Sequence, residues 1–158
     1  MATQAETLAA KVTAANAALI DTVHQCSDDD WRTHCPGEAR LVGVLAHHVA
    51  LAYGPIAGMA QAAADGEAPE LPTLEALAAM NAHQVTELAN GGRDETDELL
   101  RRNGAAAAAL VGGLSDVQLA RTFTAFGGQE WTVAFFIESA VAGHAAQHLD
   151  SIRDTLAA

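Results

Sequence analysis

Residues 41–59 read LVGVLAHHVALAYGPIAGM, and this stretch decides the fold class because its apolar residues return at the spacing of an α-helix. The residues that fall largely on one side of that helix are Leu41, Val44, Leu45, Val49, Leu51, Ala52 and Ile56. A projection at about 100° per residue places His48 close to the centre of this apolar side and His47 at its edge. The stretch therefore predicts a helix packed in a core, with an imidazole ring inside it.

Two segments near the ends of the chain show the same periodicity. The N-terminal segment ends before Cys26, where CSDDDWRTHCPGEAR gathers Asp, Pro and Gly. The C-terminal segment follows Thr132, a residue type that caps helix N-termini. The periodic residues are Leu8, Val12, Ala15, Leu19 and Val23 in the first segment and Val133, Ile137, Val141 and Ile152 in the last. Each segment is expected to bury one side in a shared core.

A longer helical region begins at Thr73 and is interrupted at NGGRDE, residues 90–95. We interpret it as one helix in two pieces, because Gly91 and Gly92 are suited to end the first piece and Asp94 is suited to cap the second. It would form the third of four amphipathic helices in the chain.

Little of the remaining chain has helical or strand periodicity. Residues 112–130 are expected to be mostly loop, and strand signals are absent apart from RTFTAF at residues 121–126. Four amphipathic helices without repeats predict an all-α fold. We expect a single four-helix-bundle domain over residues 1–158, with its third helix interrupted.

Composition and charge argue against two classes of partner. The chain of 158 residues has a formal net charge of -12 and no Lys or Arg cluster, so we expect no nucleic-acid partner. Glu6 and Lys11 interrupt the alanine-rich N-terminus, which does not resemble a signal peptide, and no stretch has the uninterrupted apolar length of a membrane span. We therefore expect a cytoplasmic protein without a membrane partner, in which Cys26 and Cys35 are free thiols.

Two histidines, His144 and His148, lie one helical turn apart in GHAAQHLDSI, residues 143–152. Counted from Ile137 at about 100° per residue, both face the interior of the bundle, as His48 does from the second helix. Burying an unpaired imidazole costs about 1–3 kcal/mol, and one divalent cation can bind a nitrogen from each of three rings. We therefore predict that His48, His144 and His148 are metal ligands.

A histidine on an apolar helix face has a simpler interpretation, because it is usually hydrogen-bonded to a backbone carbonyl, and a chance H-x-x-x-H pattern is common. Three hypotheses stay open: a metal-dependent enzyme, a non-catalytic bundle that binds a metal or a small molecule for sensing, sequestration or detoxification, and a structural bundle. Imidazole suits several divalent ions, of which we name Zn or Ni first and Fe next. No side chain is nominated as a general base.

Other candidate residues carry weaker signals. One group matches no standard zinc spacing and is interpreted as scattered residues, mostly at the surface: His24, Cys26, His34 and Cys35. Within CPG, Cys35 is either a reactive thiol or, as we prefer, a turn residue packed under the second helix. His83 is expected to face solvent, and His47 to lie beside the metal ligands or at the surface. Trp31 and Trp131 would either line a pocket or cover the core.

Three motifs together resemble the DinB-like superfamily, which includes mycothiol- and bacillithiol-dependent transferases and the mycothiol-dependent maleylpyruvate isomerase. They are CPGE at residues 35–38, VGVLAHHVALA at 42–52 and GHAAQHLDSI at 143–152. The resemblance implies an up-down-down-up four-helix bundle, often paired as a homodimer. One departure is that EAR follows CPG where the family often has a tryptophan, so no particular thiol subfamily is indicated.

The same resemblance implies a site and a class of reaction. The family carries its metal on three histidines, which match His48, His144 and His148; HVALA follows His48 as the family's apolar run follows its ligand. The implied function is activation of a low-molecular-weight thiol or water at a divalent ion, in an S-transferase or isomerase. The partners would be a small-molecule thiol and an electrophile.

Overall fold

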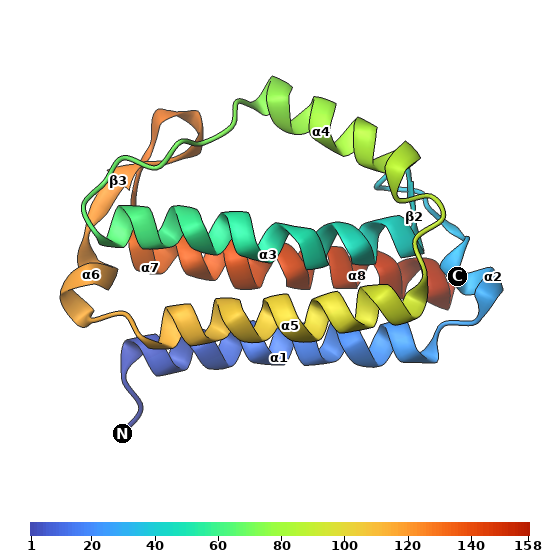
Figure 1. Ribbon diagram of the computed structural model, residues 1–158, viewed down its shortest axis with the longest axis horizontal. Helices are drawn as coiled ribbons and strands as arrows, with labels where there is room; N and C mark the ends of the chain where they lie inside the picture. Colours follow the sequence, from blue (N-terminus) through green and yellow to red (C-terminus); the bar gives the residue numbers. More distant parts are fainter.

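Four long helical segments lie side by side along the molecule (Figure 1). The computed structural model describes all of residues 1–158, and the expected all-α class is confirmed. The segments are α1 (Gln4–Gln25), α3 (Val42–Ala64), α5 (Arg93–Gly112) and a C-terminal rod made of α7 (Val133–Phe136), the π-helical turn η2 (Ile137–Ala142) and α8 (Gly143–Ala157). In Figure 1, α1 and the C-terminal rod run in one direction, and α3 and α5 run in the other.

The core is built where these four segments meet, and each contributes fully buried aliphatic or aromatic side chains. Examples are Leu19 from α1, Leu45 from α3, Leu100 from α5 and Phe136 from α7. Burial of side chains of this size stabilises the fold by about 1.5–3 kcal/mol each. Each helix buries only the side that faces the core, and for this reason the apolar residues recur in the sequence at helical spacing.

The helix α4 (Leu74–Glu87) corrects our interpretation of residues 73–111 as one interrupted helix. It is a separate helix, has no buried residue, and arches over α3 instead of continuing along α5 (Figure 1). Helix α5 begins after Gly92, which is its N-terminal cap, and not at a cap formed by Asp94. The chain therefore turns sharply between the two helices, and only α5 packs within the bundle.

The connections between the long helices are more ordered than expected. The segment after α1 holds the short helix α2 (Asp28–Trp31) and an antiparallel pair, β1 (His34–Cys35) with β2 (Arg40–Leu41). The segment expected to be mostly loop holds α6 (Asp116–Ala120), β3 (Thr122–Thr124), the 3₁₀ turn η1 (Phe126–Gly128) and β4 (Glu130–Thr132). The strand expected in RTFTAF is present as β3, which pairs with β4.

The C-terminal rod begins at the expected cap, because the Thr132 hydroxyl accepts a hydrogen bond from the backbone N–H of Phe135 at 3.1 Å. It then departs from regular α-helix at η2, where the Gly143 N–H bonds to the carbonyl of Glu138, five residues back. A Cβ atom at Gly143 would lie 2.9 Å from that carbonyl oxygen. The wide turn therefore requires glycine immediately before His144.

Helix α3 is long and apolar enough to cross a membrane when judged by length and composition alone. Its 23 residues include an 18-residue window of mean hydropathy 1.3, which corrects the expectation that no segment has this character. Within the protein, 61% of that window is buried, as in any helix at the centre of a core. By itself the helix is weak evidence for a membrane span.

We predict that Gly143→Ala lowers the free energy of unfolding by about 1–3 kcal/mol, because the added methyl group collides with a backbone carbonyl that cannot move away cheaply. The matched control is Gly58→Ala in α3, where a Cβ meets nothing within 4 Å. That change should raise stability by up to about 1 kcal/mol through helix propensity. Urea denaturation measures both, and equal stabilisation by the two variants would contradict the wide turn at Gly143.

Candidate metal centre

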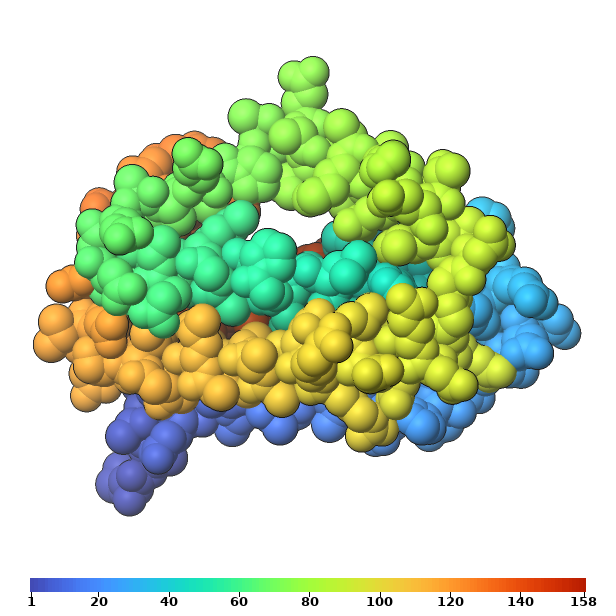
Figure 2. All heavy atoms as spheres, in the orientation of Figure 1, coloured from blue at the N-terminus to red at the C-terminus, as the bar shows by residue number.

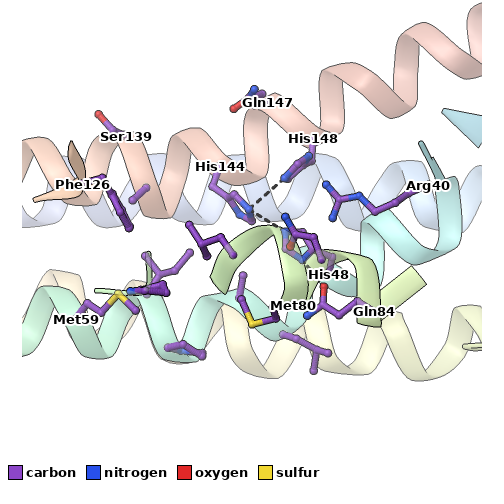
Figure 3. A pocket seen from close by; sticks show the side chains of 18 of the residues that line it. Arg40, His48, Met59, Met80, Gln84, Phe126, Ser139, His144, Gln147 and His148 are labelled. Atoms are coloured by element: carbon purple, nitrogen blue, oxygen red, sulfur yellow. Dashed lines mark hydrogen bonds between the residues drawn. The ribbon is translucent and has the colours of Figure 1, made fainter. Parts of the chain in front are cut away.

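Three imidazole rings meet between α3 and α8 (Figure 3). The Nε2 atom of His144 lies 3.1 Å from Nε2 of His48 and 3.1 Å from Nε2 of His148. The candidate ligand atoms of all three residues lie within 4.8 Å of one another. His48 comes from α3, and the other two come from successive turns of α8. The structure thus brings together the three histidines singled out in the sequence.

Two of the rings are oriented by hydrogen bonds on their outer nitrogens. His48 Nδ1 lies 2.7 Å from the side-chain oxygen of Gln84, and His148 Nδ1 lies 3.2 Å from Oε1 of Glu38. Because both partners are acceptors, each Nδ1 carries the proton and donates it outward. The unprotonated Nε2 atoms of His48 and His148 therefore point their lone pairs at His144, which is the arrangement found around metal-ligating histidines.

This pattern leaves one hydrogen too few at the centre. His144 Nε2 can carry a single proton and can donate it to His48 or to His148, but not to both. A cation placed among the three nitrogens satisfies all of them at once. Ligand nitrogens about 2.0–2.1 Å from a tetrahedral ion lie about 3.3 Å apart, close to the two separations of 3.1 Å. The residues present therefore fit a divalent metal ion.

The three rings are held neutral, which is the form that binds a metal. Burial lowers the pKa of His48 to about 4 and, together with the nearby His148 and His48 rings, lowers that of His144 to about 3. Burial also lowers the pKa of His148, although the Glu38 carboxylate opposes this. The charge of Arg40 works in the same direction as burial on all three rings.

Glu38 and Arg40 reach the site from the β1–β2 hairpin. Its turn includes Ala39 with a positive φ of 52°, and Arg40 pairs with Cys35 across the hairpin. The Glu38 carboxylate accepts hydrogen bonds from Ser151 Oγ at 3.0 Å and from Arg40 Nη2 at 3.0 Å, in addition to its contact with His148. Burial alone would raise the pKa of Glu38, but the neighbouring His148 and these donors outweigh it and leave the pKa below its ordinary value.

A cavity of about 570 Å³ opens beside the three rings, within the size range of small-molecule sites. It lies between α3, α4, the C-terminal rod and the β3–β4 hairpin, and Figure 2 shows the hollow beneath α4. The rings of His48, His144 and His148 form part of its wall. Its apolar wall is formed by Leu51, Ala52, Pro55, Ile56, Met59, Pro72, Leu77, Met80, Phe126, Trp131 and Ala140. A small molecule in this cavity would therefore be in contact with the three histidines.

His47 does not join the cluster. It is buried between α3 and α5, and its Nδ1 donates to the hydroxyl of Thr96 at 2.9 Å, which in turn donates to the carbonyl of Gly92 at 2.9 Å. Its role is to pair the buried polar groups at the start of α5. Both expectations for His47 are therefore wrong, because the ring is not at the surface and does not contact the three histidines of the cluster.

The remaining candidates are dispersed, as expected, but not all lie at the surface. Cys26 and Cys35 are buried free thiols, which corrects the assignment of Cys26 to the surface and agrees with a buried Cys35. His24 is exposed and contacts Asp97 at 3.0 Å, and His83 faces solvent. Trp131 lines the cavity.

Trp31 lies away from the cavity, where its indole N–H donates to the carbonyl of Gly91 at 2.9 Å. The two tryptophans therefore divide between the two roles considered for them.

Sequence reasoning missed Glu38, Arg40 and Gln84. The first two lie in a short hairpin without periodicity, so no pattern indicates where their side chains point. Gln84 lies on α4, which was assigned to the bundle. The existence of acceptors such as Glu38 and Gln84 could have been expected, because a buried metal-ligating histidine needs a hydrogen-bond acceptor for its second ring nitrogen.

Comparisons with known proteins bear on the family and the fold of the chain. A search of curated protein sequences finds no match. Among solved structures, the chain is similar to a mutant of the mycothiol-dependent maleylpyruvate isomerase, with a TM-score of 0.73 and 13% sequence identity. The match covers 96% of this chain but 63% of that protein, so the chain spans less than two thirds of its length, and at this identity the likeness shows the fold alone. The model of the DinB superfamily matches residues 12–152, and the chain belongs to that superfamily.

Proposed function

We propose that the protein is a metal-dependent enzyme that activates a low-molecular-weight thiol or water for S-transfer or isomerisation. His48, His144 and His148 would hold the divalent ion, with Zn or Ni named first and Fe next. The observation that carries the proposal is the convergence of three Nε2 atoms at the wall of a cavity large enough for a substrate. The likeness to a protein named as mycothiol-dependent supports a thiol as one partner.

The chain's own residues would prepare the site before any substrate enters. Glu38 and Gln84 hold two rings with their lone pairs turned inward, and burial keeps the rings neutral. The largely apolar wall of the cavity would limit the number of water molecules beside a bound substrate. A divalent ion bound by three neutral ligands retains its full charge and supplies an ionised nucleophile at neutral pH by lowering the pKa of a thiol or water.

The alternative is a bundle that binds a metal or small molecule without catalysis, for sensing, sequestration or detoxification. One observation favours it: no carboxylate, thiol or amine is among the residues that line the cavity. Glu38 faces His148, Ser151 and Arg40 instead. Proton transfer would therefore depend on the histidines or on the substrate itself.

A homodimer, a cytoplasmic location and a single domain stay predictions.

We predict that the protein, purified without an affinity tag, binds one divalent ion per chain and that His148→Ala weakens this binding by at least about 100-fold. The matched control is His83→Ala on α4, which removes an exposed imidazole and should leave the metal content unchanged. Elemental analysis and calorimetric titration with Zn or Ni measure both. If His148→Ala does not fold, His144→Ala at the half-buried ring serves instead. Full metal occupancy in either variant would reject the site.

We predict that the dissociation constant for the ion rises less than about threefold between pH 7.5 and pH 6, because the pKa values of His48 and His144 are lowered to about 4 and about 3 and burial also lowers that of His148. Three imidazoles with ordinary pKa values near 6.5 would lose about 50-fold in affinity over the same interval. Affinity should fall steeply only at lower pH. A 50-fold loss by pH 6 would mean that the rings are not held neutral by burial.

We predict that at least one of glutathione, mycothiol and bacillithiol reacts with 1-chloro-2,4-dinitrobenzene faster in the presence of the metal-loaded protein than without it. His144→Ala should remove the acceleration, because it removes a ligand while leaving the cavity open, and His83→Ala should retain it. Absorbance of the thioether product measures the rate. Metal binding without acceleration by any of the three thiols would favour the non-catalytic alternative.

A further inference from the structure

Arg40 is buried beside the three histidines with part of its guanidinium group unpaired. Only 7% of the residue is exposed, and it contributes to the cavity wall. Its Nη2 donates to Oε2 of Glu38 at 3.0 Å, whereas its Nη1 is buried and has no hydrogen-bond acceptor. A buried charged donor without an acceptor is costly, because it has lost its water and gained nothing in exchange.

The neighbouring acceptors are already engaged. Oε1 of Glu38 is shared by His148 Nδ1 and Ser151 Oγ, and Oε2 is bound by the other nitrogen of Arg40 itself. Figure 3 shows the guanidinium group of Arg40 directed toward His48 and His148, at the polar end of the cavity. Because Arg40 is among the residues that line the cavity, a ligand bound there can supply an acceptor to its guanidinium group.

The rest of the cavity has the opposite character. Beyond the histidines most of its wall is apolar, with side chains such as Ile56, Met59 and Trp131. Apart from Arg40, its other polar residues are uncharged: Asn81, Gln84, Ser139 and Gln147. A ligand that matches the whole cavity therefore has a hydrocarbon or aromatic body and a single anionic end. The buried cation stands out in a chain of net charge -12, whose overall field would repel an anion.

We propose that Arg40 is a specificity-determining residue that binds the carboxylate of an amphiphilic monocarboxylic acid through its guanidinium group. The apolar body of that molecule lies along α3 beneath α4, with its head beside His48 and His148. As a statement about the substrate, this inference rests on the proposed function. As a statement about binding, it depends on Arg40 and the cavity alone.

The experiment compares two ligands of the same shape and different charge, 4-phenylbutyrate and 4-phenylbutyramide, by calorimetric titration of the full-length protein after chelation of metals. The wild-type protein should bind the carboxylate at least about tenfold more tightly than the amide, because a charge-assisted hydrogen bond replaces a neutral one. Arg40→Met should reduce the affinity for the carboxylate to that for the amide. The matched control Arg102→Met removes an exposed arginine outside the cavity and should keep the tenfold preference.

Equal affinities of the wild-type protein for the two ligands would overturn the inference, and so would a preference that survives in Arg40→Met. The wild-type comparison stands by itself if Arg40→Met does not fold. The same titrations on metal-loaded protein separate this inference from the proposed function. An Arg40-dependent preference in a protein that binds no metal would uphold the inference and reject the function, whereas a preference that appears only with metal and ignores Arg40 would do the reverse.

Discussion

The close approach of α3 to α8 is the constraint on which the site depends. It places His48 on one helix opposite His144 and His148 on the other, with the ring nitrogens at hydrogen-bond distance. Burying three imidazoles is favourable only if their polar atoms are paired. Two outward N–H groups find acceptors in Gln84 and Glu38, but the inward lone pairs outnumber the hydrogens available to them. The bundle therefore tolerates this cluster best when a cation completes it.

The elements that complete the rings lie outside the bundle core. Gln84 belongs to α4, which buries no residue, and Glu38 belongs to a hairpin of two-residue strands. Packing alone holds α4 weakly, because it has no buried residue, whereas the hairpin buries Cys35 in the core. The contact of Gln84 with His48 is thus a large part of what positions α4. Occupancy of the cavity and the placement of α4 are coupled, because a ligand there would contact α3 and α4 at once.

The sequence was sufficient to identify the three rings because each lies on a regular helix. His48 lies at the centre of an apolar stripe, and the spacing of His144 and His148 within α8 is that of one turn. The projection from Ile137 assumes a regular α-helix, but η2 turns more widely and changes the angular positions of the residues that follow it. The agreement for the pair comes from their own i, i+4 spacing, which the wide turn leaves intact.

The path of α4 could not be predicted, because a break at Gly91 and Gly92 specifies a change of direction but not its angle. If α4 were part of the bundle, Gln84 would not reach His48 and there would be no cavity beneath α4. The position of Glu38 depends on contacts with residues more than 100 positions away, such as Ser151, which local periodicity does not encode. Arg40 is in turn held by Glu38.

The two charges beside the rings have opposite effects on their protonation, because Arg40 lowers the pKa of each ring and Glu38 raises it. Arg40 disfavours a proton on any of the three histidines, while it and Ser151 help to keep Glu38 ionised despite burial. An ionised Glu38 makes His148 a better electron donor through its Nδ1–H, and a neutral carboxyl group would not. Burial and Arg40 therefore keep the rings free of protons, while Glu38 keeps one of them strongly basic toward a metal ion. Histidines that served only as hydrogen-bonded core residues would require neither the lowered ring pKa values nor the increased basicity of His148.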